Sequence, residues 1–244
     1  MDTAARPRYV KAMSTASKLP IILLPGMDGT GDLLAKLADT LSPLRPVQVV
    51  AYPSHKPLDY AALTTLAAQA LPEGPCVVLG ESFSGPIAIE LAATRQKQIR
   101  AVILAATFVR SPLPAALAHL ARYASPRWMP RKAKEALMLG KFGTPQLRML
   151  LHSVTSKLPP DVLMQRAVDV LRVDKRDRLG AVACPILYLQ GSADRIIRRK
   201  CLREIMAIQP ATTVRTFNAP HMLLETHARD AAQAINAFCV AHGL

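Results

Sequence analysis

The stretch VVLGESFSGPIAIELA, residues 77–92, sets the fold class of this 244-residue chain. It opens with an apolar run of strand length, passes through glycines and serines, and continues with helical spacing. The turn nearly matches G-x-S-x-G, in which a serine sits on a sharp strand-to-helix corner between small residues. Gly80 fills the first glycine position, Ser84 stands in the second, and a glycine follows one place later at Gly85. On these residues alone Ser82 is a candidate nucleophile, with a helix N-cap or a phosphate-loop residue as the alternative.

Apolar runs of strand length alternate with helix-period segments through most of the chain. The middle runs are apolar on both faces, which is typical of parallel strands covered by helices on both sides. The sequence therefore predicts an α/β fold with a doubly wound, mostly parallel sheet and right-handed crossovers. The expected strands are 20–26, 47–53, 76–82, 101–109, 185–191 and 212–218, and the expected helices are 31–41, 57–71, 84–97, 198–209 and 226–241.

Residues 110–180 interrupt this alternation. They contain seven prolines, no convincing strand, and amphipathic helical stretches such as DVLMQRAVDVLRV. We expect a helical lid inserted at 111–180, between core segments 19–110 and 181–244. Residues 1–18 are expected to form a flexible tail.

The composition suits a folded domain, because half of the residues are apolar and a fifth are charged. The four cysteines are widely spaced and form no metal-binding pattern, so we expect reduced thiols. No run reaches the ~18–20 apolar residues that span a bilayer. The N-terminal residues lack the apolar block of a secretory signal. These features predict a cytoplasmic protein without a membrane span.

The net charge of +14 raises the question of a nucleic-acid partner. Residues 110–180 hold fourteen basic and five acidic residues, so much of the excess lies in the insertion. No basic motif with interleaved aromatic residues accompanies it, and we therefore expect no nucleic-acid binding.

Two distant segments supply partners for Ser82. Asp194 lies within GSADRII, just after the expected strand 185–191, and His221 lies within PHMLLE, after the last strand. Functional side chains of open α/β sheets gather at the carboxyl ends of the strands. The order Ser, Asp, His along the chain is that of α/β-hydrolases.

Over residues 19–244 the sequence resembles the α/β-hydrolase superfamily, in its serine-esterase form with a helical lid. The matching pieces are LLPGMDGTG, GESFSG, GSADRII and PHMLLE. The resemblance implies a carboxylic ester hydrolase with Ser82, Asp194 and His221 as catalytic residues, and no metal or organic cofactor. His221 would take the serine proton, and Asp194 would orient the imidazole. The chain begins at what resembles the third family strand, which implies a sheet reduced at its N-terminal edge.

The resemblance also implies an oxyanion hole built from main-chain N–H groups. We expect Phe83 and Met27 to supply them, with Asp28 as the second choice in the loop. Glu81 is expected to influence the electrostatics of the site without a catalytic role. The residues expected to line the substrate pocket are Gly26, Asp28 and Trp128.

The basic residues of the insertion have two interpretations: a solvated helical face, or a docking surface for an acidic partner. In size and layout the chain is distantly similar to the esterases of pimeloyl-carrier-protein methyl ester, which makes acyl carrier protein a candidate partner. The residues proposed for such docking are Arg122, Arg127, Arg131 and Lys132.

Three other functions remain open from the sequence. The same triad supports thioester hydrolysis and acyl transfer. A ligand-binding protein on the hydrolase fold is the non-enzymatic alternative. Acyl length, alcohol group and oligomeric state are not specified by these motifs.

Overall fold

The computed structural model describes residues 18–113 and 129–244. These residues contain a six-stranded sheet in the order β2-β1-β3-β4-β5-β6, in which every neighbouring pair is parallel. The predicted α/β fold with a parallel sheet is therefore confirmed. The strands are β1 (Ile21–Leu24), β2 (Val47–Val49), β3 (Cys76–Glu81), β4 (Ile99–Ala105), β5 (Ile186–Gly191) and β6 (Thr213–Phe217).

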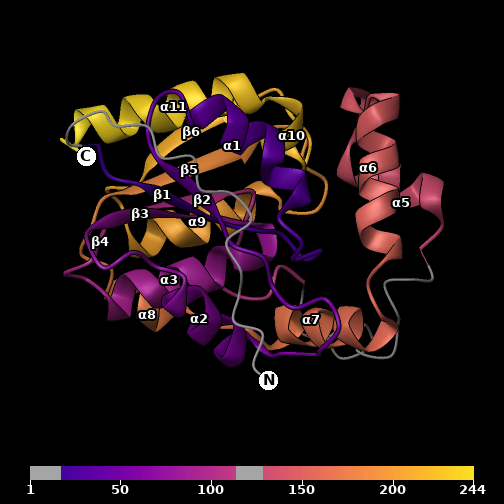
Figure 1. The fold of residues 1–244 in the computed structure, drawn as a ribbon, viewed down its shortest axis with the longest axis horizontal. Coiled ribbons are helices and arrows are strands. Elements are labelled where there is room, and N and C mark those ends of the chain that lie inside the picture. Colours follow the sequence, from indigo (N-terminus) through magenta and orange to yellow (C-terminus); the bar gives the residue numbers. More distant parts are fainter. Residues whose placement is uncertain (1–17, 114–128) are drawn as a thin grey trace.

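Helices cover both faces of the sheet (Figure 1). On one face lie α1 (Ala35–Leu41), preceded by the 3-10 turn η1 (Asp32–Leu34), and α11 (Ala228–Ala241), preceded by α10 (Leu223–Thr226). On the other lie α2 (Tyr60–Gln69), α3 (Gly85–Thr94), α8 (Arg176–Gly180) and α9 (Arg199–Ile208). Because both faces are covered, all residues of β3 are buried, as its apolar sequence predicts.

Several predicted elements have different ends in the structure, and for two of them the backbone shows why. The strand expected at 47–53 stops at Val49, because the chain turns toward the loop after β1, where Tyr52 N–H donates to the Gly29 carbonyl oxygen at 2.7 Å. The helix expected at 226–241 is divided at His227, whose φ of −125° and ψ of 39° are not helical.

The insertion leaves and rejoins the core at one place. Arg110 and Asp174 form an isolated antiparallel bridge, so the two ends of the insertion lie side by side. Its described helices are α5 (Arg131–Met138), the 3-10 turn η4 (Gly140–Phe142), α6 (Pro145–Ser156) and α7 (Pro160–Arg172). Figure 1 shows α5 and α6 beside the layered core. Helix α8, expected to belong to the insertion, packs instead on α3 and α9 of the core.

The strand order places one crevice where the chain changes direction. From β1 the chain moves outward to β2 and then crosses back to β3 on the other side of β1. In doubly wound sheets such a point, at the carboxyl ends of the strands, opens a crevice for ligands. Here the loop that follows β1 and the turn that follows β3 meet.

Candidate active site

Ser82 lies on a strained turn directly after β3. Its backbone φ is 47°, in the left-handed region that residues with a side chain rarely adopt. Gly80 makes room for this turn, because a Cβ there would lie 2.5 Å from the Ser84 carbonyl oxygen and 2.8 Å from Ala88 Cβ. The strain presents the Ser82 hydroxyl above the end of the strand, the geometry of a nucleophile elbow.

Ser84 and Gly85 account for the departure from G-x-S-x-G. The Ser84 hydroxyl donates to the Pro25 carbonyl oxygen and lies 2.8 Å from Tyr52 Oη, so it ties the turn to the loop after β1. Gly85 allows α3 to approach the segment after β4, because a Cβ there would collide with the side chain of Thr107. Ser84 therefore makes hydrogen bonds that a glycine could not make. Gly85 is required because α3 packs closely against Thr107.

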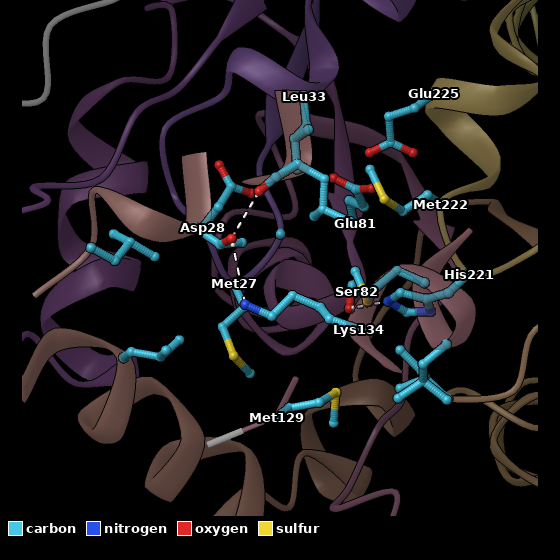
Figure 2. A pocket seen from close by; sticks show the side chains of 18 residues that line it. Met27, Asp28, Leu33, Glu81, Ser82, Met129, Lys134, His221, Met222 and Glu225 are labelled. Atoms are coloured by element: carbon cyan, nitrogen blue, oxygen red, sulfur yellow. Dashed lines mark hydrogen bonds between the residues drawn. The ribbon is translucent and has the colours of Figure 1, made fainter. Parts of the chain in front are cut away.

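Asp194, His221 and Ser82 form a continuous hydrogen-bonded line. His221 Nε2 lies 2.9 Å from Ser82 Oγ, and His221 Nδ1 lies 2.9 Å from Asp194 Oδ2 (Figure 2 shows the first of these contacts). The other Asp194 oxygen accepts the N–H groups of Ile196 and Ile197, both at 2.8 Å. The Asp194 carboxylate is thereby fixed on one side by the main chain and fixes the imidazole on the other.

The loops that carry the acid and the base are joined by main-chain contacts. Ser192 N–H donates to the Phe217 carbonyl oxygen at 2.8 Å, and Ala193 N–H donates to that of Ala219 at 3.0 Å. Gly191 permits this approach, since a Cβ there would lie 2.6 Å from the Ala219 carbonyl oxygen. Because β5 and β6 are neighbours, their carboxyl ends bring Asp194 and His221 together.

A buried arginine from the insertion braces the loop after β1. Arg166 of α7 is 1% exposed. Its Nη1 donates to the carbonyl oxygens of Met27 at 2.8 Å and Asp28 at 2.9 Å, and its Nη2 donates to that of Pro53 at 3.1 Å. The N–H of Met27 has no acceptor among the described residues. Arg166 thus binds the carbonyl oxygens of Met27 and Asp28, while the N–H of Met27 remains available to a ligand.

A cavity of about 240 Å³ opens beside the hydroxyl and the imidazole. Its described walls combine the loop after β1, the ends of β3 and α10, and residues of the insertion such as Met129 and Lys134 (Figure 2). Half of the lining residues are leucines and methionines. An apolar cavity with a few polar groups at one end is the usual form of a small-molecule site.

Three carboxyl groups belong to the polar end of this cavity: Asp28, Glu81 and Glu225. Burial raises the pKa of Asp28, although its Oδ2 accepts hydrogen bonds from Thr30 N at 2.9 Å and Thr30 Oγ1 at 2.6 Å. Burial also raises the pKa of Glu81. The pKa of Glu225 is raised well above its ordinary value by burial and by the neighbouring Glu81 carboxylate.

The comparisons with known proteins identify the family of the chain. Residues 21–234, most of the chain, match the Alpha/beta hydrolase family. The chain belongs to this family.

Relatives of the hydrolase include an enzyme named pimeloyl-[acyl-carrier protein] methyl ester esterase from Xanthomonas campestris pv. campestris (strain B100). It is 28% identical over 243 residues, covering 91% of this chain and 95% of the relative. Two solved structures share the fold, each with a TM-score of 0.80 and 15% identity. One is the esterase EaEST from Exiguobacterium antarcticum, with 98% of this chain and 100% of that chain covered. The other is a bromoperoxidase from Bacillus anthracis, with 91% and 92% covered.

The hydrolase structure brings several of the predicted site residues together. Ser82, His221, Gly26, Met27 and Asp28 all line the cavity, and Asp194 lies behind the imidazole. The side chain of Phe83 points into the core and stacks on Tyr60, with ring centroids 4.6 Å apart. Trp128, Arg122 and Arg127 lie outside the described residues. Arg131 and Lys132 lie on α5, where Arg131 pairs with Glu135 at 2.8 Å.

Sequence reasoning missed two residues of the site, Arg166 and Glu225. Arg166 is one of the fourteen basic residues of the segment 110–180, but it follows Val162 by four residues and Leu163 by three, on the apolar stripe of α7. Glu225 ends the quoted motif PHMLLE, four residues after His221. Because His221 lies before α10, which begins at Leu223, this spacing is not a helical repeat, and the sequence offers no clear signal for Glu225.

No metal centre emerges from the part of the chain that the structure describes: no three or more His, Cys, Asp or Glu side chains gather where they could hold an ion. None of the helices within residues 18–113 and 129–244 is long and apolar enough to cross a membrane. The four cysteines, all within these ranges, are unpaired.

Proposed function

We propose that this α/β hydrolase is a serine carboxylesterase that works through a covalent acyl-enzyme. The observation that carries this proposal is the line of hydrogen bonds from Ser82 through His221 to Asp194, with its hydroxyl end in an apolar cavity. A hydroxyl is a weak nucleophile at neutral pH, and an adjacent imidazole is the group that activates it.

In the proposed reaction Ser82 Oγ attacks the ester carbonyl carbon as His221 Nε2 takes the hydroxyl proton. Asp194 orients the imidazole and stabilises its cationic form. The N–H groups of Met27 and Phe83 stabilise the developing oxyanion. His221 then protonates the departing alcohol, and a water molecule attacks the acyl-enzyme by the reverse sequence to release the acid.

The insertion has the proposed role of a lid over the acyl portion of the substrate. Leu137 and Met138 of α5, Leu151 of α6 and Leu163 of α7 line the cavity opposite the core. Their burial against an acyl chain would remove apolar surface from water, worth about 25 cal/mol per Å². We place residues 111–173 in this lid, because the chain returns to the core at Asp174.

A p-nitrophenyl ester of butyrate tests the proposed function. The parent enzyme is expected to release p-nitrophenol with a burst equal to the enzyme concentration when deacylation is slow, and then to turn over. Ser82→Ala is expected to lower kcat by about 10⁴-fold or more. Ser192→Ala, an exposed serine of the acid loop, is the matched control and retains activity.

Absence of both burst and turnover, with Ser82→Ala behaving as the parent, would favour the ligand-binding alternative. Faster reaction with matched thioesters, or with added alcohol acceptors, would favour the thioesterase or the acyltransferase.

A more specific candidate substrate is an acyl methyl ester linked to a carrier protein. The relatives named for this activity align over almost the whole chain. A shallow hollow beside α5 adds a structural argument, because its described walls include four cationic side chains and one acidic side chain, Glu135. The four are Lys132, Lys141, Arg148 and Arg195. Such a surface suits an acidic partner.

Charge reversal at this hollow separates docking from catalysis. Lys132→Glu with Lys141→Glu is expected to lower kcat/KM for a carrier-linked methyl ester about tenfold or more at low salt, with little effect on a p-nitrophenyl ester. Lys97→Glu, an exposed lysine after α3, is the control. Equal losses on both substrates would contradict a docking role.

A further inference from the structure

Two carboxyl groups interrupt the apolar wall of the cavity next to the proposed nucleophile and base. Glu81 is the last residue of β3 and precedes Ser82, and Glu225 follows His221 by four residues in α10. Both side chains line the cavity, and Figure 2 shows their carboxyl groups on the same side of it. The segments that carry the reactive groups therefore also carry this pair.

The pair is buried and short of hydrogen-bond donors. The two residues are 6% and 3% exposed. Glu81 Oε2 and both Glu225 oxygens are buried without a hydrogen-bond partner among the described residues. By contrast, the Asp28 carboxylate is already engaged by Thr30. A buried polar atom left without a partner costs roughly 1–3 kcal/mol, so these oxygens require a donor.

One shared proton supplies part of that requirement. Two carboxylates that share one buried site do not readily both ionise: burial raises the pKa of both groups, and the Glu81 carboxylate raises that of Glu225 further. A proton held between Glu81 and Glu225 leaves the pair with one negative charge and with acceptor oxygens still unfilled. The remaining donor has to come from the cavity itself.

The nitrogen-bearing side chains at the cavity or close to it do not provide this donor. Arg166 is engaged by three main-chain carbonyl oxygens. Lys134, on the insertion side, lies 3.5 Å from Thr155 Oγ1. His221 is engaged by Ser82 and Asp194. A ligand that fills the polar end with an alkyl group would leave the carboxyl oxygens dehydrated, and a carboxylate there would be repelled.

We propose that the Glu81–Glu225 pair is a specificity element that selects esters carrying a hydroxyl group close to the ester, through a hydrogen bond donated by that hydroxyl. This inference rests on the proposed esterase function and deepens it. The apolar wall contacts the hydrocarbon part of the substrate, while the carboxyl pair accepts a hydrogen bond from one uncharged donor, the substrate hydroxyl. Binding sites built around a substrate hydroxyl discriminate strongly against analogues that lack it, because the buried acceptor is then left unpaired.

Isosteric ester pairs test the proposal, since each pair differs by a hydroxyl in place of a methyl group. On the alcohol side the pair is glycol monobutyrate and propyl butyrate. On the acyl side it is methyl β-hydroxybutyrate and methyl isovalerate. The parent enzyme is expected to prefer the hydroxy ester of at least one pair by about tenfold in kcat/KM.

Glu225→Met is expected to bring this ratio close to one. Glu204→Met, at a half-buried glutamate that pairs with Arg110 away from the cavity, is expected to leave the ratio unchanged. Replacement of buried paired charges by apolar residues is often tolerated by the fold. If Glu225→Met does not fold, Glu225→Gln replaces it in the test. The Gln amide group donates to Glu81 and keeps only one acceptor oxygen at position 225, so the preference for the hydroxy ester is expected to fall about threefold.

The outcomes separate this proposal from the esterase function. If the parent hydrolyses none of these esters and no p-nitrophenyl ester, the esterase function fails. If it hydrolyses them without preference for either hydroxy ester, or if the folded Glu225 variants keep the preference of the parent, the carboxyl pair is not a specificity element.

Discussion

The Arg166 guanidinium donates to the main-chain carbonyl oxygen of Met27 at 2.8 Å. This bond joins α7 of the insertion to the loop proposed to stabilise the oxyanion. Arg166 is not among the described residues that line the cavity, and we therefore propose that it acts by positioning the loop. A main-chain donor acts well only when it is held in place before charge develops.

Loss of this guanidinium is expected to lower kcat more than it raises KM. Arg166→Gln leaves the carbonyl oxygens of Met27, Asp28 and Pro53 with fewer donors, and the loop is no longer held. We expect kcat for a p-nitrophenyl ester to fall about 10–100-fold, within the range seen for loss of an oxyanion donor. Arg172→Gln, at an exposed arginine of the same helix, is the control. A change confined to KM would contradict the positioning role.

The Ser84 hydroxyl is expected to contribute to stability. Ser84→Ala leaves the Pro25 carbonyl oxygen and the Tyr52 hydroxyl without this partner in a buried site. Urea denaturation is expected to show a loss of about 1–3 kcal/mol in the free energy of unfolding. Ser156→Ala removes an exposed hydroxyl and is expected to change it by less than about 0.5 kcal/mol. Equal effects of the two substitutions would show that the hydrogen bonds of Ser84 to Pro25 and Tyr52 do not contribute to the free energy of unfolding.

Gly85 is expected to tolerate no side chain. Gly85→Ala places a methyl group against the side chain of Thr107, 2.6 Å from its Cγ2, and overpacking of this kind costs about 1–3 kcal/mol or more. Gly74→Ala meets nothing within 4 Å and is the control. The thermal midpoint of Gly85→Ala is expected to fall, and Thr107→Ala in the same chain is expected to restore part of it. An unchanged midpoint would place α3 farther from the segment after β4 than the structure does.

The stability of the protein is expected to decrease as pH rises above the ordinary pKa of a glutamic acid. Burial raises the pKa of Glu225 and Glu81 in the folded state, so the folded chain keeps protons that the unfolded chain has released. The free energy of unfolding therefore falls with pH, from the unfolded pKa up to the folded one. Asp28, whose pKa is also raised, contributes in the same direction. Nearby Arg166 and the imidazole of His221 favour the ionised forms and limit the effect.

Glu225→Gln isolates this effect. Its free energy of unfolding is expected to decrease less than that of the parent between about pH 5 and pH 8, because the amide does not titrate. Glu204→Gln is the control and should follow the parent. Parallel curves for Glu225→Gln and the parent would mean that Glu225 is ionised in the folded state.

The sheet and the position of Ser82, Asp194 and His221 could be predicted because they depend on local pattern and chain order. Strands buried on both faces are written as apolar runs, and the carboxyl ends of parallel strands must meet at one edge. The end of β2 was not predictable, since it depends on a bond to Gly29 in a distant loop. Arg166 and Glu225 were missed for a related reason: residue type alone suggests solvent, and burial depends on what packs over the helix.

The bridge between Arg110 and Asp174 brings the two ends of the insertion together, so that the insertion joins the core at a single place. An insertion attached in this way can change in length and sequence while the sheet is preserved, which gives evolution and protein engineering a route to new substrates. Arg166 sets the condition on any exchange, because the replacement must deliver an equivalent cation to the loop after β1. An exchanged insertion without such a cation would provide a different cavity wall but leave the loop after β1 unsupported, and we expect activity to be lost.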